Sequence, residues 1–502
     1  MLDFDSLNNA IDLLTASLGP WWAVVPGILI GMVSAAIPGI SISMAMAVVL
    51  PVTLFMDFVP AMLFLTAVFT GGGFGAGIPA IIMNIPGEAG AVATAFDGYP
   101  MAQRGQHNEA LGVALAASTA GAAFGYIVLL FLIFPISTFV IKLGPSEFFV
   151  IVCWGLTLIA VLRGKHFFRG ILSGLIGLLA GTIGMNAVGT LRGTMGIPHL
   201  LDGIPIIPAM VGLFAASALF DLVNKEYLIE LEESRRVNVG KIFRGMRLGY
   251  TYPLVMLRGS IIGTLIGAIP GIGTSVSNLV SYAETKKRDA NPASFGTGNP
   301  KGVVAAESAN SSGEGGSLIT LLSLGIPGGG ATAVMLAAFS MHNITGGPQF
   351  IREHTDIVYA IILANFVQVI LLLVLGLIFI RVLLLVVKVP VRFLIPSVLT
   401  LAVFGAYGQT GNLSGPVTVL VFGLIGWWAT QNEYSIPAMV IGLLLGRMAE
   451  GELLRTYRIS GGELGYLTER PLTLLLLALL VTSVIIMPLW RARRPKDAPK
   501  LP

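Results

Sequence analysis

The sequence predicts an all-α protein that crosses a membrane many times, and its composition is the first reason. Of the 502 residues, 55% are hydrophobic and 11% are charged, whereas about 25% of the residues in a soluble domain are charged. Apolar runs such as Ala114–Phe134, Ile357–Ile380 and Leu472–Pro488 approach or exceed the roughly 18–20 residues that span a bilayer. Strands of a membrane barrel would instead alternate in short segments. From the lengths of the runs we expect about 12 transmembrane segments in a polytopic membrane protein.

An internal repeat is the second reason. Residues 31–43 read GMVSAAIPGISIS and residues 263–275 read GTLIGAIPGIGTS, so that Pro38 and Pro270, 232 residues apart, occupy matching positions. Proline removes a backbone donor and glycine frees the backbone to turn. Each copy therefore predicts a break within a hydrophobic helix.

A second pair of breaks follows the first. IPGEAGA begins at Ile85 and IPGGGAT begins at Ile326. Two halves that each carry two Pro/Gly breaks are typical of secondary transporters with discontinuous helices. Aligning the prolines of the second pair, Pro86 and Pro327, also matches Gly75 with Gly316, Ala76 with Ser317, and Asn84 with Gly325.

The distribution of charge is the third reason, and it predicts the orientation. Membrane proteins concentrate Lys and Arg on the cytoplasmic side, so the basic tail predicts a cytoplasmic C-terminus, and the acidic start of the chain predicts a periplasmic N-terminus. The apolar run after the first break ends without a basic residue near Asp57, but the matching run ends in the basic segment 284–289. Equivalent ends thus face opposite sides, which predicts two inverted repeats. We expect a first repeat half (1–223), a cytoplasmic connecting segment (224–250), a second half (251–490) and a cytoplasmic tail (491–502).

The breaks are the first candidate for a binding site. In hydrocarbon, an interrupted helix survives only where protein, water or ligand satisfies its free backbone groups, and its exposed N-terminus attracts anions. Hydroxyls that follow the breaks can cap the helix or bind a carboxylate; the alternative is a kinked helix whose Ser and Thr side chains bond their own backbone. The predicted substrate-binding residues at the breaks are Pro38, Gly39, Ser41, Ser43, Asn84, Pro86, Gly87, Pro270, Gly271, Gly273, Thr274, Ser275, Pro327 and Gly328.

A polar stretch before the fourth break is the second candidate. Residues 307–316 read ESANSSGEGG and lead directly into an apolar run. Ionisable groups in such a place are functional by default; oxygen ligands suit sodium, and a carboxylate alone could carry a proton. The alternative is a wet cytoplasmic loop that caps a helix. Asn310, Ser311 and Ser312 are predicted to bind substrate or the coupling ion, and Glu307 and Asn84 to take part in ion coupling.

The sequence lacks the motifs that mark the common classes of membrane enzyme. The sequence contains no Walker loop, HExxH motif or Ser-His-Asp set, so neither an ATPase nor an intramembrane protease is indicated, and we expect no enzyme and no cofactor. The net charge of +4 comes from residues in loops and does not predict binding to nucleic acid. The segment Asp97–Arg104 is predicted to be a polar turn at the membrane face, in which these two residues could pair. Cys153 is the single cysteine, so no intrachain disulfide forms.

The repeated motifs carry a family resemblance. GMVSAAIPGIS, residues 77–105, GTLIGAIPGIGTSVS and residues 302–330 resemble the large membrane subunit of the tripartite tricarboxylate transporter family of bacteria. The resemblance implies a symporter in the cytoplasmic (inner) membrane that takes up citrate or another carboxylate with sodium ions or protons. It further implies a small four-helix membrane subunit and a periplasmic solute-binding protein as partners; a homodimer is left open. Family members often carry two asparagines where this chain has Asn310 followed by Ser311, and small polar residues where it has Glu88; both departures concern the identity of the carboxylate.

Two rival functions remain open on the sequence alone. A channel would use polar rings along a continuous pore, but it could not accumulate its solute against a gradient. A membrane scaffold would leave the solute path to its partners, and binding of solute by the purified subunit would argue against it.

Overall fold

The structure is a computed structural model. It describes residues 4–15, 19, 21–37, 40–140, 142–162, 167–186, 189–222, 237–270, 274, 276–386, 391–463, 465 and 469–492. Within these ranges the chain is mainly helical, and its strands are the two-residue antiparallel pair β1 (Gly184–Met185) and β2 (Leu191–Arg192). The predicted all-α class is confirmed.

The chain forms two compact units, and each unit takes residues from both sequence halves. Unit 1 comprises residues 1–140 and 207–428, and unit 2 comprises residues 141–206 and 429–502. The boundaries of the repeat halves given above stay a prediction. Unit 2 contains α8 (Pro145–Leu162), α9 (Phe167–Gly181), η4 (Pro198–Leu200), α21 (Ile436–Ile459) and α22 (Pro471–Ala492), together with β1 and β2.

Unit 1 contains all four breaks and most of the helices. From the first half come α1 (Phe4–Thr15), α2 (Val24–Ala35), α3 (Ile42–Val49), η1 (Leu50–Phe55), α4 (Phe58–Gly75), α5 (Gly77–Met83), η2 (Ala89–Ala91), α6 (Val92–Gln103) and α7 (His107–Val140). The first half also contributes α10 (Ile206–Val211), η5 (Gly212–Ala216) and α11 (Ser217–Leu222). The remaining helices are α12 (Val239–Tyr250), α13 (Pro253–Gly267), α14 (Ser277–Arg288), η7 (Pro292–Ser294), α15 (Pro300–Leu324), α16 (Gly330–Met341), α17 (Pro348–Glu353), α18 (Thr355–Val386), α19 (Val391–Thr410) and α20 (Ser414–Gln431).

Among the described residues, three helical stretches are long and apolar enough to cross a membrane. They are Phe58–Met83, His107–Val140 and Thr355–Arg381. Several further apolar helices have only 10–17 residues, as expected where helices are interrupted. The number of about 12 crossings therefore stays a prediction.

The helices stop at each pair of Pro/Gly motifs. The α2 helix ends at Ala35 and α3 starts at Ile42, and in the second half α13 ends at Gly267 and α14 starts at Ser277. At the second pair, a residue in the left-handed conformation ends the helix in both halves. Asn84 (φ 59°) follows α5, and the residue matched to it, Gly325 (φ 68°), follows α15.

The same packing contacts recur in the two halves. A Cβ atom at Gly31 of α2 would overlap the carbonyl of Val68 in α4, and one at Gly263 of α13 would overlap the carbonyl of Ala309 in α15. These positions match in the sequence repeat. Two more contacts recur at matched positions. The contact of Gly75 with Met32 corresponds to that of Gly316 with Thr264, and the contact of Gly87 with Ala35 corresponds to that of Gly328 with Gly267. The repeat is thus preserved in three dimensions as a helix pair, α2 with α4 and α13 with α15.

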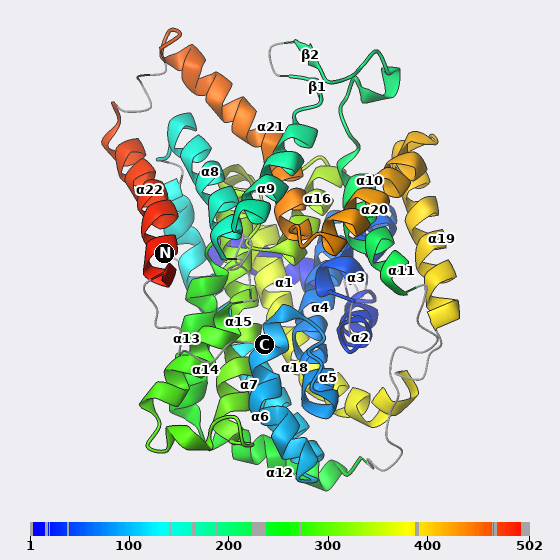
Figure 1. Ribbon diagram of the computed structural model, residues 1–502, viewed down its shortest axis with the longest axis vertical. Helices are drawn as coiled ribbons and strands as arrows, with labels where there is room; N and C mark the ends of the chain where they lie inside the picture. The colour runs from blue at the N-terminus through cyan, green and yellow to red at the C-terminus, as the bar shows by residue number, and fades with distance from the viewer. Residues whose placement is uncertain are drawn as a thin grey trace. The chain divides into compact units, whose positions relative to one another are not determined.

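The two helix pairs are packed against long helices of the opposite half. The α15 helix lies against α7, where Gly121 and Gly125 approach the backbone of Ser308 and Ser312. Conversely, α4 lies against α18, and Gln368 donates to the Leu63 carbonyl at 3.0 Å. In Figure 1, α4 is blue and α7 is cyan, whereas α15 and α18 are yellow-green to yellow. Small residues at these contacts let the backbones approach closely, as in other membrane helix pairs.

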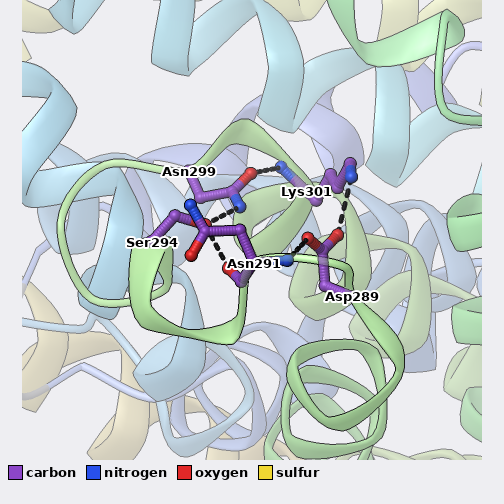
Figure 2. A network of polar contacts seen from close by, with 5 residues as sticks. All are labelled: Asp289, Asn291, Ser294, Asn299 and Lys301. Carbon is purple, nitrogen blue, oxygen red and sulfur yellow. Dashed lines mark hydrogen bonds and ion pairs between the residues drawn. The ribbon is translucent and has the colours of Figure 1, made fainter.

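The connection between α14 and α15 is a compact polar turn (Figure 2). Asp289 accepts hydrogen bonds from Lys301 Nζ at 2.6 Å and from the Asn291 backbone N–H at 2.9 Å. The Ser294 hydroxyl donates to the Asn291 carbonyl at 2.7 Å and accepts from Asn299 Nδ2 at 2.8 Å. The Asn299 side chain also caps α15 by accepting from the Lys301 N–H at 3.0 Å. These bonds fix the point at which α15 starts.

Asp97 holds this turn, and the prediction of a polar turn around it was wrong. Residues 92–103 form helix α6, and Asp97 is fully buried. Its Oδ1 accepts hydrogen bonds from the backbone N–H groups of Gly296, Gly298 and Asn299 at 2.8–2.9 Å, and its Oδ2 accepts from the Tyr282 hydroxyl at 2.9 Å. These four donors, all from the second half, are its partners in place of Arg104, and the carboxylate lies inside the protein.

Candidate functional site

The polar stretch 307–316 lies in the middle of α15, and every residue in it is buried. The alternative of a wet cytoplasmic loop is therefore wrong. The stretch can be helical because its small residues let neighbouring helices approach and because Glu307, Asn310 and Glu314 form hydrogen bonds with those helices. A buried polar helix in a membrane protein is the place where ligand and ion sites are expected.

Glu307 is held by two hydroxyls from the first half. Its Oε1 accepts from the Thr94 hydroxyl of α6 at 2.6 Å, and its Oε2 accepts from the Ser118 hydroxyl of α7 at 2.8 Å. The residue is fully buried, and the backbone of Gly77, where α5 starts, lies directly against the carboxylate. The described ion pairs do not include Glu307, so neutral donors surround it.

Glu314 lies two turns further along α15 in a similar arrangement. The Thr70 hydroxyl of α4 donates to Glu314 Oε1 at 2.6 Å and is itself 2.8 Å from the Tyr126 hydroxyl of α7. Glu314, Thr70 and Tyr126 are all buried. Two carboxylates on one buried helix thus share the same chemistry, since each accepts hydrogen bonds from hydroxyl groups of neighbouring helices.

Asn310 lies beside the place where two of the break loops meet. Its Nδ2 donates to the Gly73 carbonyl at 3.1 Å. Its Oδ1 lies so close to Gly90 that a Cβ atom there would overlap it, and the same Cβ atom would be 3.3 Å from Thr274 Oγ1. Gly90 follows the second break of the first half, and Thr274 follows the first break of the second half. These two loops therefore meet beside Asn310.

Asn278 fixes the same meeting point. Its Oδ1 accepts from the Ala93 N–H at 3.2 Å, and its Nδ2 donates to the carbonyls of Ala89 and Thr274 at 3.1 and 3.3 Å. One side chain of α14 thus bonds the loop before α6 and its own break loop. The broken ends of the two halves are joined by hydrogen bonds, not merely adjacent.

The other two break loops also meet across the halves. A Cβ atom at Gly330, where α16 starts, would overlap Ser43 Oγ in α3. Ser43 follows the first break of the first half and is buried, and Gly330 follows the second break of the second half. All four breaks are therefore paired crosswise, each with a break from the opposite half.

The structure places the remaining predicted residues in different surroundings. Ser41 is the N-cap of α3, and its hydroxyl accepts a hydrogen bond from the Met44 N–H at 3.1 Å. Of the two roles expected for this hydroxyl, helix capping and carboxylate binding, the structure shows helix capping. Asn84 ends α5 with an exposed side chain, whereas Asn310 is buried. The Ser312 hydroxyl bonds the Ala309 carbonyl of its own helix at 3.3 Å. Pro86, Gly87, Pro270, Pro327 and Gly328 form the described backbone of the break loops, and Pro38, Gly39, Gly271, Gly273 and Ser275 lie outside the described residues.

Several residues of the site were not predicted. Thr94 and Ser118 have no local signal in the sequence, because a hydroxyl in an apolar helix is usually bonded to its own backbone. The alignment of Pro86 with Pro327 matches Thr70 with Ser311, but this match does not indicate that Thr70 is the partner of Glu314.

A small cavity in unit 2 is a weaker candidate. It has a volume of about 160 Å³ and is lined by residues that include Asn186, Arg447 and Glu450. Its charged groups are already engaged, since Arg447 donates to the Asp202 carbonyl and Glu450 pairs with Arg192. None of the predicted site residues lines it.

The fold and the site define a helical membrane protein with paired broken helices around a buried polar helix. Residues 22–441 match the family model described as the tripartite tricarboxylate transporter TctA family. The chain belongs to this family, which confirms the resemblance seen in the sequence. It is a membrane component of a tripartite transporter, and the family is one of transporters rather than enzymes.

Two curated relatives come from Agrobacterium vitis. The "Uncharacterized 52.8 kDa protein in TAR-I ttuC' 3'region" is 30% identical over 478 residues, which cover 95% of this chain and 94% of the relative. The "Uncharacterized protein in TAR-II ttuC' 3'region" is 31% identical over 235 residues, which cover 47% of this chain and 97% of the relative. No solved structure matches the chain.

Proposed function

We propose that this protein carries out secondary uptake of a tricarboxylate or dicarboxylate across the bacterial inner membrane, driven by a gradient of sodium ions or protons. The observation that carries the proposal is the crosswise meeting of the four break loops beside the polar helix α15. A binding site formed by discontinuous helices of two repeats is the arrangement that secondary transporters use. The solute site lies where these loops meet.

The break loops supply groups that suit an anion. The α3 and α14 helices both start just after a break, so their free N–H groups and positive dipole ends point toward the loops. Ser43 and Thr274 add hydroxyl donors at the two meeting points, beside Gly330 and Gly90. Asn310 adds an amide next to Thr274. Backbone N–H groups, hydroxyls and amides together recognise carboxylates without a fixed positive charge.

The buried carboxylates supply the coupling. A carboxylate surrounded only by neutral groups in a membrane requires a proton or a cation to offset its charge. Glu307 has two hydroxyl donors and Glu314 has Thr70, so binding of a proton or of sodium at these groups is linked to the charge of the solute nearby. Asn84 and Ser312 complete the set of residues proposed to bind ion or substrate.

Membership of the tripartite family supports the proposed partners, and the lengths of the apolar runs and the distribution of charge support the proposed topology. The protein works with a small four-helix membrane subunit and receives solute from a periplasmic solute-binding protein. It contains about 12 crossings in two inverted repeats, with its N-terminus in the periplasm and its C-terminus in the cytoplasm. The basic segments 235–247 and 286–288 lie on the cytoplasmic side.

Uptake into vesicles tests the function. The complex is reconstituted with the binding protein, and sodium and pH are varied independently across a panel of carboxylates. We expect saturable accumulation of a carboxylate that requires one of the two gradients. Equilibration without accumulation would favour a channel and overturn the proposal.

An Asn310→Ala variant tests the site. It removes the amide that lies where the two break loops meet, so uptake should fall while membrane insertion is retained. Ser323→Ala is the matched control, because Ser323 is also buried in α15 and its hydroxyl bonds the Ile319 carbonyl of the same helix. Equal uptake by the two variants would remove Asn310 from the site.

A further inference from the structure

Gly73 of α4 has room for a side-chain carbon inside the helix packing. A Cβ atom at Gly73 would have a single described neighbour within 4 Å outside its own helix, Ser311 Oγ at 3.8 Å. The neighbouring glycines differ, because Cβ atoms at Gly71, Gly72 and Gly75 would overlap atoms of α2 or of Ile42. Close packing therefore requires glycine at those positions but not at Gly73, where its effect is to leave room in front of Ser311.

The Ser311 hydroxyl faces this space without a partner. Ser311 is 4% exposed, and among the described residues its Oγ has no hydrogen-bond partner. The other buried serines of α15 do bond backbone carbonyls, for example Ser308 with Val304 and Ser317 with Gly267. A buried hydroxyl that is left unpaired costs free energy, so a missing hydrogen-bond partner is expected beside Ser311.

The repeat shows what kind of partner fits. The alignment of Pro86 with Pro327 matches Thr70 with Ser311 and Gly73 with Glu314. At the first of these positions, the Thr70 hydroxyl donates to the Glu314 carboxylate at 2.6 Å. At the matched position the hydroxyl is present but the carboxylate is replaced by the hydrogen of Gly73. The packing of α2 on α4 and of α13 on α15 recurs around both, so the two environments share their backbone frame.

We propose that the space between Gly73 and Ser311 is a subsite for one carboxylate group of the transported solute. The Ser311 hydroxyl donates to that carboxylate as Thr70 donates to Glu314. The subsite lies next to Asn310, which binds the Gly73 carbonyl and touches the break loops, so a solute of two or more carboxylates reaches from the subsite to the broken helix ends. This inference rests on the proposed function and names the group of the solute that this part of the site recognises.

Transport by substituted proteins is the first test. Ser311→Ala removes the donor, and loss of one hydrogen bond to a charged group should raise the apparent KM for the carboxylate about ten- to hundredfold. Ser311→Thr keeps a hydroxyl, as at Thr70, and should stay close to the parent. Gly73→Glu places a tethered carboxylate in the subsite and should abolish uptake. Ser323→Ala is the control and should leave uptake unchanged.

Protection of a cysteine is the second test, and it stands even where Gly73→Glu does not insert. Ser311→Cys is made in a Cys153→Ser background, which has no other cysteine, and is labelled in reconstituted protein with a methanethiosulfonate reagent. Citrate or succinate should slow labelling severalfold, and glycerol, a neutral compound, should not. Sodium chloride against choline chloride, without carboxylate, tests occupation by sodium.

The outcomes separate the two levels of the proposal. Protection by carboxylate, together with a raised KM in Ser311→Ala, supports the subsite. Protection by sodium alone, or no protection by carboxylates that the protein accumulates, overturns it and leaves the transport function standing. If the parent complex accumulates no carboxylate at all, the proposed function fails, and the subsite fails with it.

Discussion

Replacing Asp97 by alanine removes the contact by which the first half holds the start of α15. In the structure this carboxylate accepts hydrogen bonds from three backbone N–H groups of the turn 296–299 and from the Tyr282 hydroxyl. The alanine variant leaves all four donors without their acceptor. Since α15 carries Glu307 and Asn310, the change also loosens the helix on which the site is built.

The cost can be estimated from the bonds. A hydrogen bond to a charged group contributes about 1.5–3 kcal/mol. The three backbone donors are partly buried, so water replaces some of what they lose, and we take about 1 kcal/mol for each. With the bond from Tyr282, Asp97→Ala should destabilise the protein by about 4 kcal/mol. Tyr282→Phe removes one donor and should cost about 1 kcal/mol, and Asp97→Asn, which keeps an acceptor oxygen, should lie between the two.

Thermal unfolding of the purified protein in detergent measures this order. Because membrane proteins commonly unfold irreversibly, all variants are compared at one scan rate. Asp57→Ala is the control, since Asp57 is exposed and its side chain does not cap α4. We expect the lowest Tm for Asp97→Ala, then Asp97→Asn, then Tyr282→Phe. A Tm for Asp97→Ala equal to that of Asp57→Ala would refute the role assigned to this carboxylate.

Three further predictions concern the site, the packing and the surface. Glu307→Gln should lower gradient-driven uptake at least tenfold by removing the group that takes the ion, and unchanged accumulation in vesicles would contradict that. Gly31→Ala and Gly263→Ala should each destabilise the protein by about 1–3 kcal/mol through overpacking, and the two variants should show similar decreases in Tm. Gly408→Ala is the control and should leave Tm unchanged, because no described atom beyond the adjoining backbone lies within 4 Å of a Cβ atom at Gly408. Unequal decreases for Gly31→Ala and Gly263→Ala would argue against equivalent packing in the two halves. The hydrogen bond from Lys301 lowers the pKa of Asp289, so its stabilising effect is present above the unfolded-state pKa of about 4 and is lost as the pH falls through the lower folded value. Asp289→Asn should therefore reduce the stability at neutral pH by less than about 1 kcal/mol and lower Tm slightly. The difference in Tm should shrink below about pH 4, which thermal scans at several pH values measure.

The breaks were predictable because their signal is local. Proline and glycine change the backbone wherever they stand, so the interruptions near Pro86 and Pro327 follow from a few adjacent residues. The repeat added the correspondence of Asn84 with Gly325, and both residues do end their helices in the left-handed conformation. What the pattern did not contain is which break meets which.

The pairings across the halves were not predictable from single segments. Asp97 stands in the sequence DGYP, which favours a turn locally, but its four donors come from residues about 200 positions away. Likewise, Thr94 and Ser118 show no feature that marks them as partners of Glu307. A buried carboxylate indicates that donors must exist, but the fold decides which helices bring them.

The exchange of helices between the halves bears on how the protein is made. When the first half has been synthesised, the hydroxyls of Thr94 and Ser118 and the helix α7 are in place, but the acidic helix that they receive has not yet left the ribosome. When α15 enters the bilayer, the hydroxyl donors for its Glu307 carboxylate are therefore already present. In contrast, α4 has no packing partner from the second half until α18 has been synthesised. Neither half can complete its interior alone, so two separately expressed fragments divided in the segment 224–250 should accumulate only when they are produced together.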